Sequence, residues 1–197
     1  MRRLRFLDGP DIRPAADAVR AALVLGGVAL LPTETFYGLA ADPRSAGSVA
    51  KVYALKDRPE RMPLPVLVAD WDGLEALVTV PDRFRVRLSR TWPAALTVVL
   101  PAREPVPAAA GTGTLAVRIP AHDRLRALLY LTGPLTGTSA NRHGTPPPVA
   151  ADAALASLAA PPDVVLDGGV TAGGRPSTLV DLTGPEPRVL RPGPVAW

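Results

Sequence analysis

LLPTETFYGLAADPRSAGSVAKVYALKDRPERMPL, at residues 30–64, is the stretch that decides the fold. The apolar run Val28–Leu31, which overlaps its start, predicts a buried strand. Apolar residues at helical spacing then predict a helix from Ser45 to about Leu55, and a proline at position 59 disfavours its continuation. The apolar segment Leu64–Val68 predicts a second strand. The stretch therefore reads as a strand–helix–strand unit.

Hydroxyl groups and cations gather at the ends of these expected elements. Thr33 and Thr35 follow the first strand, and the helix ends at Lys56 and Arg58, two cations one residue apart. Lysine supplies a compact point charge and arginine can bind phosphate oxygens in pairs, so together they are a candidate cradle for an anionic ligand. On these residues alone, a polar loop and a solvated helix end explain the pattern better.

Composition bounds the class of protein. With 197 residues, 47% hydrophobic and 20% charged, we expect a globular chain forming a single domain, residues 1–197. Cysteine is absent, which excludes disulfides and thiolate metal sites. No apolar run reaches about 18 residues, and the N-terminus lacks the apolar core of a secretory signal. A cytoplasmic protein without a membrane span is the expectation.

The charge balance permits an anionic partner. The net charge is +4 and the sequence pI is about 10.1. A run of arginines falls in the expected helix Pro81–Arg90, at Arg83, Arg85, Arg87 and Arg90. A solvated helix face is the favoured interpretation of this run, and contact with an RNA backbone is the alternative.

The remaining segments predict a mixture of helices and strands. Helices are expected at 11–25, with Asp11 as N-cap, and at 71–77, 81–90, 123–131 and 150–159. Strands are expected at 1–7, 96–100, 114–119, 135–138, 164–166, 178–182 and 188–190, and 102–113 is expected to be a loop. Because strands and helices do not alternate strictly, the pattern predicts an α/β or α+β domain with a twisted, mixed sheet.

Several common site patterns do not occur. There is no GxGxxG, P-loop, GxSxG or HExxH sequence, so the chain lacks the usual signatures of dinucleotide, phosphate-loop, serine-hydrolase and zinc-protease sites. The two histidines, His122 and His143, match no short metal-ligand spacing. We interpret both as structural or surface residues and assign no protein-held metal site.

Five motifs occur in a specific order: PTETFYGLAAD (32–42), KDRPERMPL (56–64), TSAN (138–141), STLVDLTG (177–184) and VLRPG (189–193). Each alone is weak, but their order and spacing resemble the YrdC/Sua5 family of threonylcarbamoyl-AMP synthases, from about Val28 to the end. The resemblance implies an open, twisted, largely seven-stranded sheet flanked by helices, with a large concave site. Because longer relatives carry a further C-terminal domain, the chain looks like the short form.

The resemblance also implies a reaction. L-threonine, bicarbonate or CO2, and ATP would give threonylcarbamoyl-AMP and pyrophosphate, which a separate tRNA threonylcarbamoyl transferase uses on adenosine 37 of tRNA. The implied catalytic and ATP-binding residues are Lys56, Arg58, Ser139 and Asn141, with Thr114 and Arg191 on the nucleotide. The implied threonine-binding residues are Thr33, Thr35, Arg118 and Ser177. Mg2+ on the phosphates is expected from the chemistry, and Glu34 and Asp181 are available acids without an assigned role.

Two positions depart from the family pattern. Met62 stands where relatives usually have Lys or Asn, and Leu67 where His is common. These changes could weaken ATP binding, unless Arg61 substitutes. Two further hypotheses therefore stay open: an RNA-binding paralogue that contacts tRNA or double-stranded RNA with weak or no synthase activity, and carbamoyl-adenylate formation on another amine.

Overall fold

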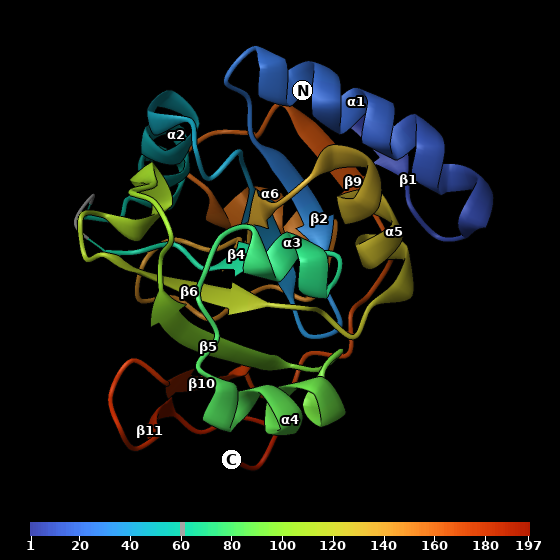
Figure 1. Ribbon diagram of the computed structural model, residues 1–197. Coiled ribbons are helices and arrows are strands. Elements are labelled where there is room, and N and C mark those ends of the chain that lie inside the picture. The colour runs from blue at the N-terminus through green and yellow to red at the C-terminus, as the bar shows by residue number, and fades with distance from the viewer. Residues whose placement is uncertain (60–61) are drawn as a thin grey trace.

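The computed structural model describes residues 1–59 and 62–197, and its strands form two mixed sheets (Figure 1). The first sheet has the order β1-β9-β2-β3-β8, and the second has the order β11-β10-β5-β6-β4-β7. The strands are β1 (Arg2–Arg5), β2 (Ala29–Pro32), β3 (Tyr37–Ala40), β4 (Val66–Leu67), β5 (Leu96–Pro101), β6 (Thr114–Arg118), β7 (Leu135–Thr136), β8 (Thr138–Ser139), β9 (Val164–Asp167), β10 (Thr178–Asp181) and β11 (Arg188–Arg191). The helices are α1 (Ile12–Val24), α2 (Ala46–Lys56), α3 (Trp71–Glu75), α4 (Asp82–Thr91), α5 (Asp123–Thr132) and α6 (Ala151–Ser157), with 3-10 turns at Gly9–Asp11 and Pro107–Ala109.

The expected mixed α/β class is confirmed, but the strands divide between two sheets instead of forming one largely seven-stranded sheet. The division occurs at Gly137. Residues before it pair with β4 as β7, and residues after it pair with β3 as β8. A Cβ atom on Gly137 would lie 2.7 Å from Cδ1 of the buried Leu67. Glycine is therefore needed where the chain passes from one sheet to the other.

Both faces of the central strands β2 and β9 of the first sheet are buried, because their residues alternate between two hydrophobic cores. Ala29 and Leu31 of β2 pack with α1 and α5, whereas Leu30 joins the core shared with α2, α6 and the second sheet. Figure 1 shows α1 and α5 lying together beside β1, β2 and β9. The period-2 alternation of a strand thus explains why an unbroken apolar run is buried on both faces.

Local signals set the helix ends near the site. The Ser45 hydroxyl accepts a hydrogen bond from the Ser48 N–H at 3.2 Å and caps the start of α2, as is usual for an N-cap serine. Asp57 ends this helix in the left-handed conformation, with φ of 51°. The helix therefore stops directly before Arg58, and its last residue is Lys56.

Asp11 stands at the expected N-cap position of α1, but its side chain does not cap the helix. Asp11 precedes α1, but its carboxylate accepts hydrogen bonds from the N–H groups of Leu7 and Asp8 instead of from the helix. His122 provides a true cap, since its Nδ1 accepts a hydrogen bond from the Leu125 N–H at 3.1 Å at the start of α5. The structural interpretation of His122 is confirmed, and His143 is exposed at the surface as expected.

The arginines of α4 contact the protein itself. The Arg87 guanidinium lies 4.1 Å from the ring centre of Trp197, and Arg85 pairs with Glu75 of α3. Arg83 donates a hydrogen bond to the Gly184 carbonyl at 2.6 Å. The helix therefore holds the C-terminal segment, and three of its four arginines are engaged within the fold. Among the described residues, no helix is long and apolar enough to cross a membrane.

Candidate functional site

A cavity of about 630 Å3 lies on one face of the second sheet. Alternate residues of three neighbouring strands line it, namely Thr97 and Val99 of β5, Thr114, Ala116 and Arg118 of β6, and Leu179 of β10 with Ser177 just before it. The intervening residues, such as Val98 and Val117, lie in the hydrophobic core. Strand alternation therefore presents hydroxyls and a cation to the cavity and apolar groups to the core.

The first sheet closes the cavity from the other side. The turn between β2 and β3 contributes Thr33 and Thr35, and the β8 segment contributes Ser139 and Asn141. Of the ten predicted site residues, nine line this one cavity: Thr33, Thr35, Arg58, Thr114, Arg118, Ser139, Asn141, Ser177 and Arg191. Segments far apart in the sequence thus meet at one place.

Lys56 is the predicted residue that stands outside the lining. Its side chain is buried, and its Nζ donates hydrogen bonds to the carbonyl oxygens of Ser139 and, at 2.7 Å, of Asn141. Burial, and then the nearby charge of Arg58, lowers the pKa of Lys56 to about 8. In this structure Lys56 therefore fixes the Ser139–Asn141 segment from behind, and its contact with phosphate stays a prediction.

Arg58 and Asn141 bring unsatisfied groups to the same wall. Arg58 donates hydrogen bonds to Thr138 Oγ1 at 3.2 Å and to the Pro63 carbonyl at 3.0 Å, while its Nε has no hydrogen-bond partner among the described residues. The Asn141 amide nitrogen binds the carbonyls of Arg142 and Thr145, and within the described structure its buried Oδ1 binds nothing. Buried polar groups normally find partners, so these atoms mark a place for a polar ligand.

A second group of side chains lies across β5, β10 and β11. Ser177 Oγ lies 2.8 Å from Thr97 Oγ1, and Arg191 donates hydrogen bonds to the Ser177 carbonyl at 2.9 and 3.1 Å and to its hydroxyl at 3.2 Å. Partial burial, and secondly the charge of Arg118, lowers the pKa of Arg191. The charges of Arg118 and Arg191 are therefore close enough to repel each other, and this repulsion favours an anionic ligand between the two guanidinium groups.

The threonines of the β2–β3 turn have a local role as well as a place in the lining. Thr33 Oγ1 accepts hydrogen bonds from the N–H groups of Thr35 and Phe36, and it lies 3.1 Å from Thr35 Oγ1. The Thr35 carbonyl accepts a hydrogen bond from Gly173 N–H at 2.7 Å, which ties the turn to the β9–β10 loop. Thr33 thus shapes the turn, and Thr35 presents its hydroxyl beside the cavity.

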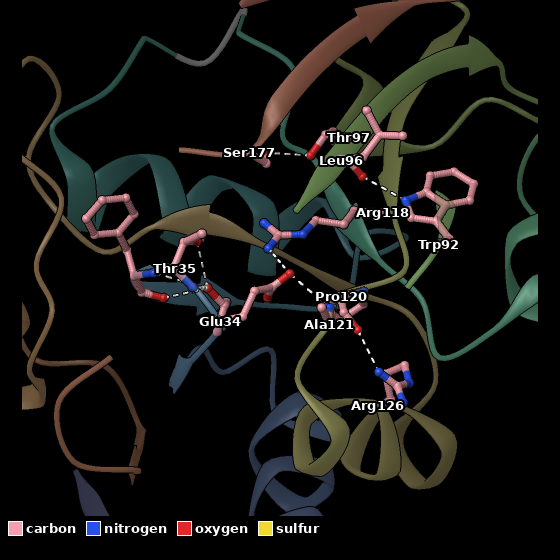
Figure 2. A network of polar contacts seen from close by, with 12 residues as sticks. Glu34, Thr35, Trp92, Leu96, Thr97, Arg118, Pro120, Ala121, Arg126 and Ser177 are labelled. Carbon is pink, nitrogen blue, oxygen red and sulfur yellow. Dashed lines mark hydrogen bonds and ion pairs between the residues drawn. The ribbon is translucent and has the colours of Figure 1, made fainter. Parts of the chain in front are cut away.

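Arg118 and Glu34 form an ion pair at the base of the site (Figure 2). Their side chains are only 7% and 16% exposed. Burial alone would raise the pKa of Glu34, but the Arg118 charge and the Ala121 N–H outweigh it, so this pKa lies below its usual value. Glu34 therefore carries a negative charge at neutral pH.

The two departures from the family pattern both lie in the cavity wall. Met62 is partly exposed at its edge, and Leu67 is buried beside Gly137. Arg61, the suggested substitute for a cation at position 62, lies outside the described residues. Neither of these two apolar side chains adds a charge to the wall, which Arg58 also lines.

The described acids near the site, Glu34 and Asp181, do not form a metal centre. Asp181 accepts hydrogen bonds from Thr183 and Arg188, and neither it nor Glu34 belongs to the lining. Among the described residues no group of three potential ligands is present, and no carboxylate lines the cavity. Mg2+ commonly takes one or two carboxylates together with substrate phosphates, and the described lining supplies no carboxylate.

Sequence analysis missed Thr97 as a site residue. It is a single polar residue inside the apolar strand 96–101, and it is only 4% exposed. A buried hydroxyl in an apolar run needs a partner, and that is the signal that could have found it. Its partner, Ser177, lies 80 positions further along the chain.

Comparison with known proteins places this chain in a family. A model named for Sua5, YciO and YrdC, with the description "Telomere recombination", matches residues 21–193. The threonylcarbamoyl-AMP synthase of Pyrococcus abyssi is 37% identical over 186 residues, which cover 92% of this chain and 54% of that protein. The synthase of Thiobacillus denitrificans is 36% identical over 172 residues, which cover 85% of this chain and 91% of that protein.

Solved structures agree with the sequence comparison. The crystal structure of Pyrococcus abyssi Sua5 complexed with L-threonine matches with a TM-score of 0.87 and 35% identity, over 98% of this chain and 57% of that one. This chain therefore spans little more than half of the Pyrococcus proteins and most of the Thiobacillus protein. From the family model, the identities and the shared fold, this chain belongs to the Sua5/YrdC family.

Proposed function

We propose that this chain is a threonylcarbamoyl-AMP synthase that uses L-threonine, bicarbonate or CO2, and ATP. The observation that carries the proposal is the convergence of nine predicted site residues on one cavity, in a chain whose relatives bear this activity in their names. The cavity has the size of a small-molecule site. Its cations suit a polyphosphate, and its hydroxyls suit an amino acid.

The chemistry requires two bond-forming steps. The threonine amine first combines with bicarbonate to give a carbamate and water. A carbamate oxygen then attacks the α-phosphorus of ATP, and pyrophosphate leaves with the electron pair of the broken P–O bond. Negative charge develops on the phosphate oxygens, so the protein's main task is to position the reactants and stabilise that charge.

The described residues divide between the two substrates. Arg58, Ser139 and Asn141 would bind the phosphates, with Lys56 holding the segment that carries the last two and neutralising charge from behind. Thr114 and Arg191 would contact the nucleotide. Because no carboxylate lines the described cavity, Mg2+ would arrive on the phosphate oxygens of ATP.

The amino acid would lie nearer the β2–β3 turn. Arg118 would bind the threonine carboxylate through paired hydrogen bonds, and Thr33, Thr35 and Ser177, which line the same cavity, would offer hydroxyl groups to the amino acid. The relative crystallised with L-threonine supports an amino-acid site in this fold. The product would pass to a tRNA threonylcarbamoyl transferase, and contact of this chain with tRNA stays a prediction.

Product analysis tests this proposal. The purified chain is incubated with ATP, bicarbonate and L-threonine, and the mixture is examined by mass spectrometry for threonylcarbamoyl-AMP. Omission of each substrate in turn, and replacement of threonine by serine or glycine, are the controls. We expect the adenylate only when all three substrates are present. An adenylate formed equally from other amines would instead support the alternative acceptor.

A further inference from the structure

Glu34 lies between Thr33 and Thr35 in the sequence, two predicted threonine-binding residues, yet it is not among the residues that line the cavity. Figure 2 shows it between Thr35 and Arg118, with its carboxylate directed to the guanidinium. Glu34 Oε1 pairs with Arg118 Nη2 and also accepts a hydrogen bond from Ala121 N–H at 2.9 Å. One carboxylate oxygen thereby joins the β2–β3 turn to β6 and to the β6–α5 loop.

The pair leaves one donor of Arg118 without a partner. Nη2 is taken up by Glu34, whereas the buried Nε has no hydrogen-bond partner within the described structure. Arginine has five N–H donors, and leaving them unpaired in a buried place is unfavourable. Because Arg118 lines the cavity, the unpaired Nε marks the place of an acceptor that a ligand would supply.

Glu34 also acts on the charge of the site. Three other cations surround the cavity, namely Arg58, Arg191 and, from behind, Lys56. Glu34 pairs with Arg118, and no ion pair of the described residues involves any of the other three cations. Its pKa is lowered, so it stays ionised, and its negative charge faces Arg118 and not the three cations that suit phosphates.

We propose that Glu34 is a positioning residue that orients the Arg118 guanidinium for the α-carboxylate of the amino-acid substrate. Glu34 itself touches no substrate in this arrangement. Its charge fixes the direction of the guanidinium plane, and its bond to Ala121 N–H fixes the carboxylate in turn. The inference rests on the proposed function, since it takes the amino acid to be bound by Arg118.

A steady-state experiment on Glu34→Gln tests the proposal. Glutamine keeps the shape of the side chain and an acceptor for Ala121 N–H but removes the charge facing Arg118. We expect KM for L-threonine to rise about tenfold, the usual worth of one charge-assisted hydrogen bond. The kcat at saturating threonine and KM for ATP should stay within about twofold of the wild type, because the phosphate residues are untouched.

A matched control and a second variant accompany this measurement. Glu75→Gln makes the same chemical change in the Glu75–Arg85 pair, which lies outside the cavity lining, and should leave KM for threonine unchanged. Glu34→Asp keeps the charge but withdraws it by one methylene, and should raise KM less than Glu34→Gln. Calorimetric binding of L-threonine in the absence of ATP provides a readout independent of turnover and should follow KM.

The outcomes separate the inference from the proposed function. If the wild type turns over with threonine and Glu34→Gln has an unchanged KM, the positioning role is refuted and the proposed function stands. If Glu34→Gln lowers kcat and leaves KM unchanged, the residue acts on the chemical step and the inference is again wrong. If the wild type neither binds threonine nor releases pyrophosphate, both proposals fail together.

Discussion

Lys56 gives a quantitative prediction because its charge is buried. Burial and the Arg58 charge lower its pKa from 10.5 to about 8, which corresponds to a cost on the order of 3 kcal/mol for keeping it charged in the free protein. Below pH 8 this cost lowers the free energy of unfolding in full. The cost disappears as the pH rises towards 10.5, because in that range the folded chain has lost the proton and only the unfolded chain binds it. At pH 9 roughly a tenth of the molecules keep a charged Lys56.

Bound ATP should raise the lowered pKa of Lys56 if the Lys56 amine lies close to the phosphates. A polyanion stabilises the protonated amine, so ATP binds better to molecules that carry the charge. From pH 7 to pH 9 we expect the affinity for ATP to fall about tenfold. At pH 8 the binding of ATP should take up about half a proton.

Isothermal titration calorimetry measures both quantities, with ATP titrated at three pH values in buffers of different ionisation enthalpy. Lys56→Met should bind ATP weakly and lose the pH dependence. Lys51→Met is the matched control, because Lys51 lies on the same helix but pairs with Asp163 at 2.8 Å. This variant should keep the wild-type change of ATP affinity with pH. If the affinity for ATP changes equally with pH in the wild type and in Lys56→Met, the placement of Lys56 beside phosphate is refuted.

Three further substitutions test other parts of the site. Arg118→Ala should raise KM for threonine. Because it leaves the Glu34 carboxylate unpaired, it should also lower the free energy of unfolding by up to about 3 kcal/mol. The double variant Arg118→Ala with Glu34→Gln should regain stability in urea titrations, whereas its KM for threonine should stay raised. Gly137→Ala should cost about 1–3 kcal/mol because its Cβ would meet Leu67, and the added substitution Leu67→Ala should then cost less than it does alone; additive losses would contradict this contact. Met62→Lys should lower KM for ATP by up to roughly fivefold, since it adds a partly exposed charge at the cavity edge, and an unchanged KM would show that the site tolerates Met62 fully.

The sequence allowed most elements to be predicted, because their signals are local. The helix expected from Ser45 to about Leu55 follows from its apolar spacing and from the proline beyond it, and the structure forms it at Ala46–Lys56. Strand β3 was missed, since YGLA is short and contains glycine. Its strand conformation depends on pairing with β2 and β8, and the latter is about 100 residues away. The division into two sheets depends on the same distant pairings.

Some features of the site could be predicted from the sequence and others could not. The family motifs located the cavity residues, although composition and periodicity alone favoured a polar loop at Thr33 and Thr35. The direction of Lys56 could not be predicted, because its partners are two backbone carbonyls more than 80 positions away. Glu34 was recognised only as an available acid, since its pairing with Arg118 depends on how the two sheets meet.

The central claim is that this cavity joins threonine, bicarbonate and ATP. Its most direct test is the initial rate of pyrophosphate release from ATP and bicarbonate, with and without L-threonine, in the wild type and in Arg58→Ala. We predict release that depends on threonine in the wild type and is lost in the variant, whose folding is checked by circular dichroism. No release by the folded wild type, or equal release without threonine, would contradict the account.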